Sequence, residues 1–152
     1  MIVFRLSKKA FINDLSGMGA EKTGGRWNSK GIPLLYTAAS RALAVVEVAV
    51  HVPLGIIPVD YHLATIEIPD DEIIEADFNT LPKNWATNPF IRQTQNIGNN
   101  FIKNNYHLAL QVPSASVAGD FNYLINPRHS EFYRVKIKTI EPFVFDVRLF
   151  KK

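Results

Sequence analysis

The sequence of 152 residues contains no cysteine. Disulfides, thiolate catalysis and the commonest structural zinc sites are therefore excluded. The four histidines show no HExxH or comparable metal spacing, and the chain has no Walker loop, no GxGxxG after a strand and no GxSxG motif. We expect no metal site and no resident cofactor.

Long apolar runs are also absent. The best candidate, residues 42–50, is interrupted by Glu47 and is far shorter than the roughly 18 residues of a membrane span. Only four apolar residues precede Arg5, so the start of the sequence lacks the apolar core of a secretory signal. We expect a protein of the reducing cytoplasm that does not enter a membrane.

The sequence also has little excess of one charge over the other. The 17 Lys and Arg residues against 14 Asp and Glu residues leave a formal charge of +3, and the basic residues are scattered apart from three short groups. A nucleic-acid surface is normally a clustered basic stripe. The composition therefore does not favour nucleic-acid binding, although binding of a small anion stays open.

What the chain has is enough apolar sequence for one core, with 47% hydrophobic residues. Strands are expected at 2–6, 32–37, 61–68, 72–76, 107–112, 132–137 and 142–148. Helices are expected at 40–51, capped by Ser40 and buried nearly all round, and at 88–104, starting at Asn88-Pro89. With no βαβαβ alternation and no linker, the pattern predicts one compact α+β domain over residues 1–152, with a curved mixed or antiparallel sheet and a few helices.

Glu47 is the only ionisable residue in its apolar helical stretch. It either lies on the one solvent-exposed edge of the helix or faces a cleft where a ligand or an arginine neutralises it, because an uncompensated buried carboxylate is costly. Arg5, inside an apolar strand, raises the same question and could pair with a nearby carboxylate.

Arg26 follows two glycines in the run GGRWN, residues 24–28. Glycines let a backbone approach a ligand closely, and a guanidinium binds phosphate or carboxylate bidentately, although a surface turn is the simpler alternative. Taken singly, Tyr36 is typical of a core tyrosine, and Ser114 and Asn126 are typical of turns.

In chain order, these pieces resemble the RES domain, the toxin half of Xre-RES toxin–antitoxin pairs. The matching motifs are FRL with Arg5, GGRWN with Arg26, LLYTAAS with Tyr36, AVVEVAVH with Glu47, VPSA with Ser114, NYLINPRH with Asn126 and FVFDVRL with Asp146 and Arg148. They span almost the whole chain.

The resemblance implies a fold related to ADP-ribosyltransferase toxins and an activity that degrades NAD, by hydrolysis or phosphorolysis of the nicotinamide–ribose bond. It implies catalytic roles for Glu47, Arg26 and Tyr36, and NAD binding by Arg5, Ser114 and Asn126, with Ser116 as an alternative to Ser114. NAD is then a substrate and not a cofactor. A cognate Xre-type antitoxin is the implied partner, nucleic acid is reached only through it, and a homodimer is compatible with the pattern.

Three alternatives stay open at this point. The same NAD grip could serve transfer of ADP-ribose to a protein, which the residues alone do not distinguish from NAD loss. A toxin directed at RNA is motivated by the alternation of Arg134, Lys136 and Lys138, which a strand would place on one face. The last alternative is an interaction module without catalysis.

Overall fold

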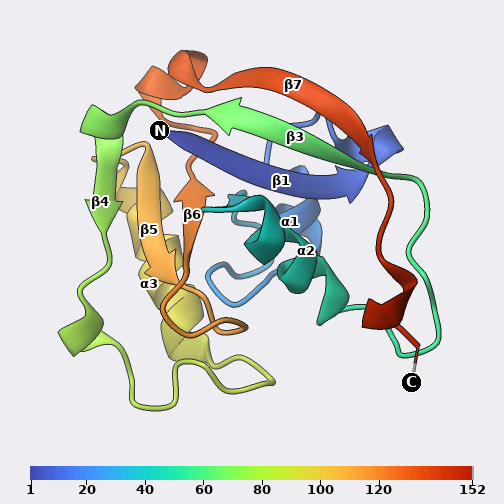
Figure 1. Ribbon diagram of the computed structural model, residues 1–152. Coiled ribbons are helices and arrows are strands. Elements are labelled where there is room, and N and C mark those ends of the chain that lie inside the picture. The colour runs from blue at the N-terminus through green and yellow to red at the C-terminus, as the bar shows by residue number, and fades with distance from the viewer. Residues whose placement is uncertain (152) are drawn as a thin grey trace.

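The computed structural model describes residues 1–151, which contain seven strands and three α-helices (Figure 1). The strands are β1 (Ile2–Lys8), β2 (Leu35–Ala38), β3 (Tyr61–Glu67), β4 (Ile73–Glu75), β5 (Ala109–Pro113), β6 (Phe121–Ile125) and β7 (Lys136–Phe143). The helices are α1 (Met18–Thr23), α2 (Arg41–Ala49) and α3 (Arg92–Asn104). Short 3-10 turns cover Lys9–Phe11, Asp70–Glu72, Phe78–Thr80, Ser130–Arg134 and Val147–Leu149.

All seven strands join one sheet in the order β4-β5-β6-β2-β1-β3-β7. Only β4 and β5 run parallel, and every other neighbouring pair is antiparallel. The two halves of the sheet meet at β1 and β2, whose register has a single pair, Phe4 opposite Ala38. In Figure 1, β1, β3 and β7 run across the top while β4, β5 and β6 stand upright on the left, with β6 pointing up, so the sheet is strongly curved. The expected α+β class with a curved mixed sheet is confirmed.

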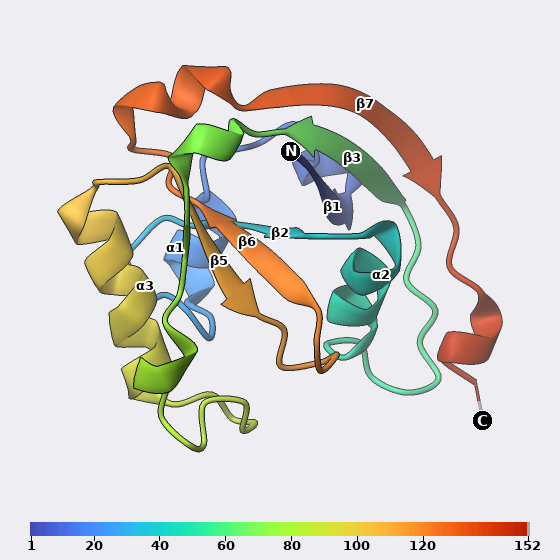
Figure 2. The same ribbon diagram turned by 60° about the vertical axis from the view of Figure 1, so that its left-hand side comes forward.

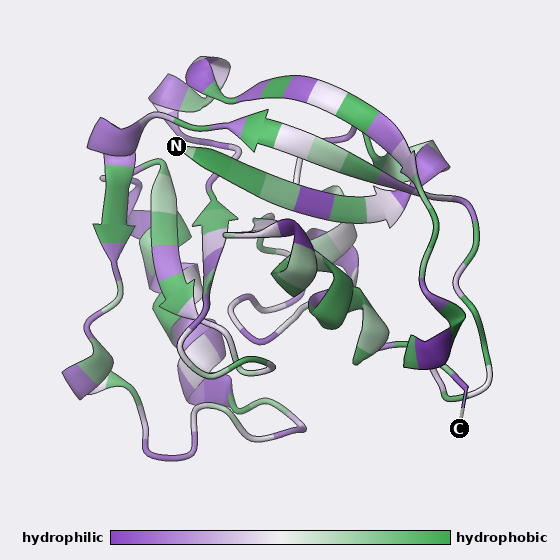
Figure 3. Ribbon diagram, in the orientation of Figure 1, coloured by the Kyte–Doolittle hydropathy of each residue, from purple (hydrophilic) through white to green (hydrophobic). Residues whose placement is uncertain are grey.

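Helix α2 follows β2 and packs against β1 and β2 beside the junction of the two halves. Ser40 caps it as expected, because its hydroxyl accepts the amide proton of Leu43 at 3.0 Å. The expectation of burial nearly all round is wrong. Only Leu43 and Ala44 are buried, because another side of the helix borders the cavities described below. Figure 3 shows that the helix is nonetheless predominantly hydrophobic.

Helix α3 covers the half of the sheet that contains β5 and β6 (Figure 2). Its Gly98 is buried against Trp27, so closely that a Cβ atom at Gly98 would overlap the Trp27 carbonyl oxygen. The indole of Trp27 is buried with Leu110 and Leu124. This packing fixes the run GGRWN against the core. The helix begins at Arg92 and not at residue 88, because the backbone is still extended at Ile91, with φ −101° and ψ 156°.

The C-terminal third differs most from the expectation. The two strands expected at 132–137 and 142–148 are in fact a 3-10 turn, the single strand β7 and a second 3-10 turn. The first turn forms because the His129 ring nitrogen accepts the amide proton of Glu131. Pro142 does not divide β7, because β7 is an edge strand and needs donors on one side only. Strand β6, between Asp120 and Asn126, was not expected.

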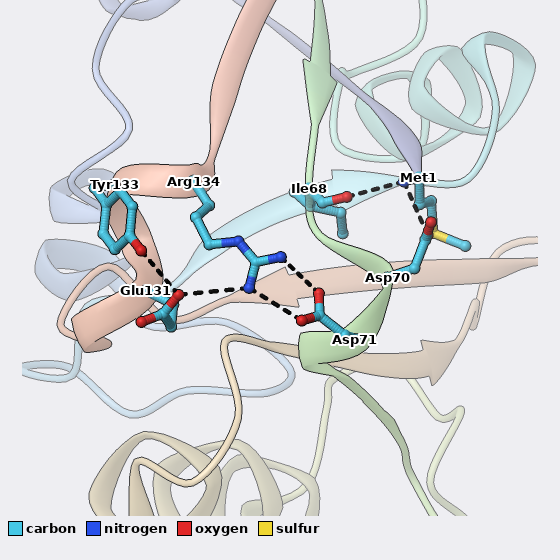
Figure 4. Close-up of polar contacts among 7 residues, drawn as sticks. All are labelled: Met1, Ile68, Asp70, Asp71, Glu131, Tyr133 and Arg134. Atoms are coloured by element: carbon cyan, nitrogen blue, oxygen red, sulfur yellow. Dashed lines mark hydrogen bonds and ion pairs between the residues drawn. The ribbon is translucent and has the colours of Figure 1, made fainter.

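Exposed ion pairs tie the turn before β7 to the turn before β4 (Figure 4). Arg134 donates to both carboxylate oxygens of Asp71, at 2.7 and 3.2 Å, and to Glu131 at 3.4 Å. The Asp71 partner raises the pKa of Arg134, and Arg134 in turn lowers the pKa of Asp71. Water and salt screen exposed pairs of this kind, so they position these turns more than they stabilise the fold.

Candidate active site

The carboxylate of Glu47 is held by three side-chain donors. Its Oε1 accepts hydrogen bonds from the Ser114 hydroxyl at 2.8 Å and from the Asn122 side-chain amide at 2.7 Å. Its Oε2 accepts the Ser116 hydroxyl at 3.1 Å. Glu47 therefore faces a polar cleft and not merely solvent, and hydrogen-bond donors compensate its charge where an arginine was one of the expected partners.

The β5–β6 hairpin supplies these donors. Its strands pair up to Pro113 opposite Phe121, and the Ser114 amide then donates to the Asp120 carbonyl at 2.8 Å. The Ser114 oxygen accepts the amide protons of Ser116 and Val117, both at 3.1 Å, which leaves its own proton for Glu47. The hairpin loop thus orients the donors without help from a ligand.

Arg26 lies across the cleft from Glu47, in the turn closed by hydrogen bonds between Gly25 and Asn28. Its Nη1 donates to the main-chain carbonyls of Trp85 at 2.7 Å and Thr87 at 2.9 Å. Burial lowers the pKa of Arg26, and the Glu47 carboxylate opposes that shift. Within residues 1–151, Nε and Nη2 of Arg26 have no hydrogen-bond partner, so this edge of the guanidinium is free to bind an anion.

The hydroxyl of Tyr36 holds the same turn in place. It donates to Oδ1 of Asn28 at 2.7 Å and accepts the amide proton of Trp27 at 3.1 Å. Burial raises the pKa of Tyr36, so the phenol stays protonated. Gly25 is required beside it, because a Cβ atom there would lie 2.8 Å from the Tyr36 oxygen. The hydroxyl is therefore structural, while the ring is available to a ligand.

Arg5 points from β1 toward the loop that follows it. Its Nη1 donates to the carbonyls of Phe11, Ile12 and Asp14 at 3.0, 3.2 and 2.9 Å. Burial lowers the pKa of Arg5, and the Asp14 carboxylate opposes the shift. Main-chain groups and not a paired carboxylate therefore account for its position.

Two cavities adjoin at Glu47. The first, of about 330 Å³, lies between β1, β2 and α1 and includes Arg5 in its wall. The second, of about 740 Å³, lies between the 24–28 turn and the loop before α3 and includes Arg26. Five residues line both cavities: Ala20, Tyr36, Glu47, His51 and Asn122. The carboxylate therefore stands at the centre of a two-part cleft.

The structure brings together Arg5, Arg26, Tyr36, Glu47 and Ser114, five of the six residues expected at the site. The sequence left the choice between Ser114 and Ser116 open, and both contact Glu47.

The structure does not bring Asn126 to this site. Its side chain is fully buried, donates to Asn105 at 2.7 Å and accepts the amide proton of Arg128 at 2.9 Å. Asn126 therefore organises the chain after β6. Asn122, which sequence reasoning missed, occupies the site in its place. Its signal was a single amide inside the apolar run FNYLI.

The described part of the chain contains neither a metal-binding cluster nor a membrane-spanning helix. Residues 1–151 contain no group of three or more His, Asp or Glu side chains placed to hold a metal ion. No helix among them is long and apolar enough to cross a membrane.

Comparison with known proteins identifies the family. The model of the RES domain matches residues 2–146. "Toxin Res" of Pseudomonas putida is 40% identical over 154 residues, covering 99% of this chain and 100% of that protein. A "Prs ADP-ribosylating toxin" of a Sphingobium species is 37% identical over 143 residues, covering 92% of this chain and 89% of that protein.

A solved structure shares the fold. The M. tuberculosis MbcT-MbcA toxin-antitoxin complex contains a chain that superposes with a TM-score of 0.75 at 20% identity, covering 94% of this chain and 84% of that one. The motifs, the curved sheet and these relatives agree: the chain belongs to the RES domain family, and the relatives that it matches are named toxins.

Proposed function

We propose that this protein is a toxin that consumes NAD by cleaving the bond between nicotinamide and ribose. One observation carries the proposal: a preorganised carboxylate, Glu47, stands where two cavities meet, with a partly unengaged guanidinium, Arg26, in the wall of the larger one. A dinucleotide has the matching shape, with two nucleoside halves joined by an anionic pyrophosphate.

The chemistry suits these residues. As the N-glycosidic bond breaks, its electron pair leaves with the nicotinamide, which is cationic in NAD and departs neutral, so no strong general acid is needed. Positive charge develops on the ribose, and a fixed carboxylate stabilises it. Glu47 would supply that carboxylate. Arg26, together with Arg5, would bind the pyrophosphate, and the Tyr36 ring would offer the nicotinamide a surface to pack against.

Incubation of the purified protein with NAD tests the proposal. NAD should disappear with time, and mass spectrometry should detect nicotinamide together with ADP-ribose in phosphate-free buffer, or its 1-phosphate when phosphate is the acceptor. An Arg128→Lys variant, changed outside the cleft, is the positive control. The proposal would be refuted if the NAD concentration stayed constant with water, with phosphate and with a protein as the acceptor.

A second function, transfer of ADP-ribose to a protein, is favoured by one relative, the 37% identical protein named "Prs ADP-ribosylating toxin". Both functions need the same cleft and differ only in the acceptor. A mass increment of ADP-ribose on a protein of a cell extract, with no free ADP-ribose formed, would favour transfer.

The partner we propose is an antitoxin that covers the cleft, supported by the toxin-antitoxin complex that shares this fold. A carboxylate-bearing segment of an Xre-type partner could satisfy Arg26 and exclude the dinucleotide. Inhibition should then be competitive with NAD and weaker for Arg26→Lys. Inhibition indifferent to both would indicate a remote site.

An RNA-directed toxin has less support. Arg134 lies in a 3-10 turn and is paired with Asp71, and Lys138 is 3.3 Å from Glu67. Two of the three basic side chains are thus engaged with carboxylates, and Arg134 lies outside β7, so the three do not form a free basic stripe on one strand face. RNA binding at moderate salt, with no NAD turnover, would revive this alternative.

A further inference from the structure

His51 lies four residues after Glu47, in the turn that directly follows the C-cap residue Val50 of α2. The turn continues through this residue, because the His51 amide donates to the Val48 carbonyl at 3.1 Å. Residues four apart on a helix face the same side. His51 accordingly lines both cavities with Glu47, and its side chain is exposed. No hydrogen bond joins its imidazole to any group in the described residues 1–151.

The proposed reaction needs a proton acceptor when water is the nucleophile. Water forms a bond to the ribose carbon as nicotinamide leaves, and one of its protons must go to a base. Glu47 is poorly placed for this task, since three of its roughly four lone-pair sites already accept hydrogen bonds. The remaining site is the one that can face the ribose.

Other groups in the first cavity are unsuited to be the base. The Asp14 carboxylate accepts the Ser16 amide at 2.9 Å, and hydrogen bonding to Ser16 lowers the pKa of Asp14. Arg5 is a cation without a free lone pair.

The groups of the second cavity are unsuited as well. The Tyr36 hydroxyl is already engaged with Asn28 and Trp27, and Arg26 is a cation. His51 is thus the one titratable side chain that lines both cavities and has no hydrogen-bond partner in residues 1–151.

We propose that His51 is the general base that accepts the proton of the attacking water. This inference rests on the proposed NAD cleavage and extends it to the acceptor side of the reaction. One N-glycosidic bond breaks, one C–O bond forms, the electron pair leaves on nicotinamide and the proton goes to the imidazole, which later releases it to solvent. Glu47 and the C-terminal end of α2 stabilise the imidazolium formed.

Basic side chains oppose that charge. Arg5 lines the first cavity and Arg26 the second, both together with His51, and Lys8 lines a further hollow that His51 also borders.

The test compares two nucleophiles in phosphate-free buffer, water and azide. Azide is an anion and attacks the ribose carbon without losing a proton. His51→Ala and His51→Gln should lower formation of ADP-ribose by about a hundredfold or more, the usual contribution of a general base. Both variants should form the azide adduct at the parent rate, and added imidazole should restore part of the hydrolysis by His51→Ala.

The matched control is His107→Gln, a histidine that lines neither cavity, which should leave both reactions unchanged. Thermal melting should show that every variant is folded. Parent-like hydrolysis by both His51 variants, or equal losses with water and azide, would overturn the role of His51 while leaving NAD cleavage intact. A parent protein that consumes NAD only with phosphate would also overturn it, whereas a parent inactive with every acceptor would refute the proposed function itself.

Discussion

Glu47 and Arg26 face each other across the cleft, yet the fold holds them by different means. Side chains of the β5–β6 hairpin hold Glu47, through two hydroxyls and an amide. Main-chain carbonyls of the loop before α3 hold Arg26. The carboxylate therefore depends on which residues occupy a few positions, whereas the guanidinium depends on where a segment of backbone lies.

The comparison first predicts the effect of removing the carboxylate. Glu47→Gln should lower NAD cleavage by about a hundredfold or more, because the amide keeps the volume but loses a charge whose contribution is about 3 kcal/mol. Initial rates of NAD loss measure the effect, and an unchanged melting temperature shows that the fold is intact. Turnover close to that of the parent would remove Glu47 from the mechanism.

For Arg26, the comparison predicts that displacing the nearby backbone is enough to lower NAD cleavage. Gly98→Ala places a methyl group against the Trp27 carbonyl, next to Arg26, and overpacking of this kind costs about 1–3 kcal/mol or more of stability. Denaturant unfolding measures the loss, and NAD cleavage should fall with it although no cleft residue has changed.

The control for that variant is Gly19→Ala. A Cβ atom at Gly19 has open space around it, and alanine favours the helix it would join. Its stability should equal or exceed that of the parent. Equal destabilisation by the two changes would show that the close contact at Gly98 is not the cause.

The same contrast explains what could be predicted from the sequence. Glu47 was recognisable because a carboxylate interrupts an apolar helix, and Asn122 carried the same kind of signal inside an apolar strand. No residue type marks the carbonyls of Trp85 and Thr87 as ligands of Arg26, because every residue has a carbonyl. Their role emerges only when the loop before α3 is placed beside the 24–28 turn.

For the fold, too, local sequence signals were predictable and tertiary contacts were not. Strand β1 and the capped helix α2 were predictable because local pattern and capping decide them. Strand β6 is central in the sheet but short, and its amides are satisfied by β2 and β5 from distant parts of the chain. Asn126 was misplaced because a polar residue after a strand can bind a ligand or organise a turn, and only tertiary contacts decide which.

A smaller effect is expected where the charge is kept and its shape is changed. Arg26→Lys should raise the KM for NAD about tenfold to a hundredfold, since charge-assisted hydrogen bonds worth about 1.5–3 kcal/mol are lost. An ammonium cannot contact the carbonyls of Trp85 and Thr87 while presenting a second edge to a phosphate. Arg128→Lys, an exposed arginine 3.7 Å from Glu21, is the control. Equal KM values for both variants would show that bidentate binding by the Arg26 guanidinium does not contribute to NAD binding.

The smallest effects separate the donors that hold Glu47. Asn122→Ala removes a half-buried donor 2.7 Å from Oε1 and should lower kcat about tenfold, since a hydrogen bond to a charged group contributes about 1.5 kcal/mol. Ser116→Ala removes an exposed donor 3.1 Å from Oε2, which water can replace, and should cost about threefold or less. Steady-state kinetics of the two variants and their double mutant would measure both terms and their coupling. Equal losses from the single changes would mean that burial of the donor does not decide its contribution, and that the hairpin holds the carboxylate as one unit.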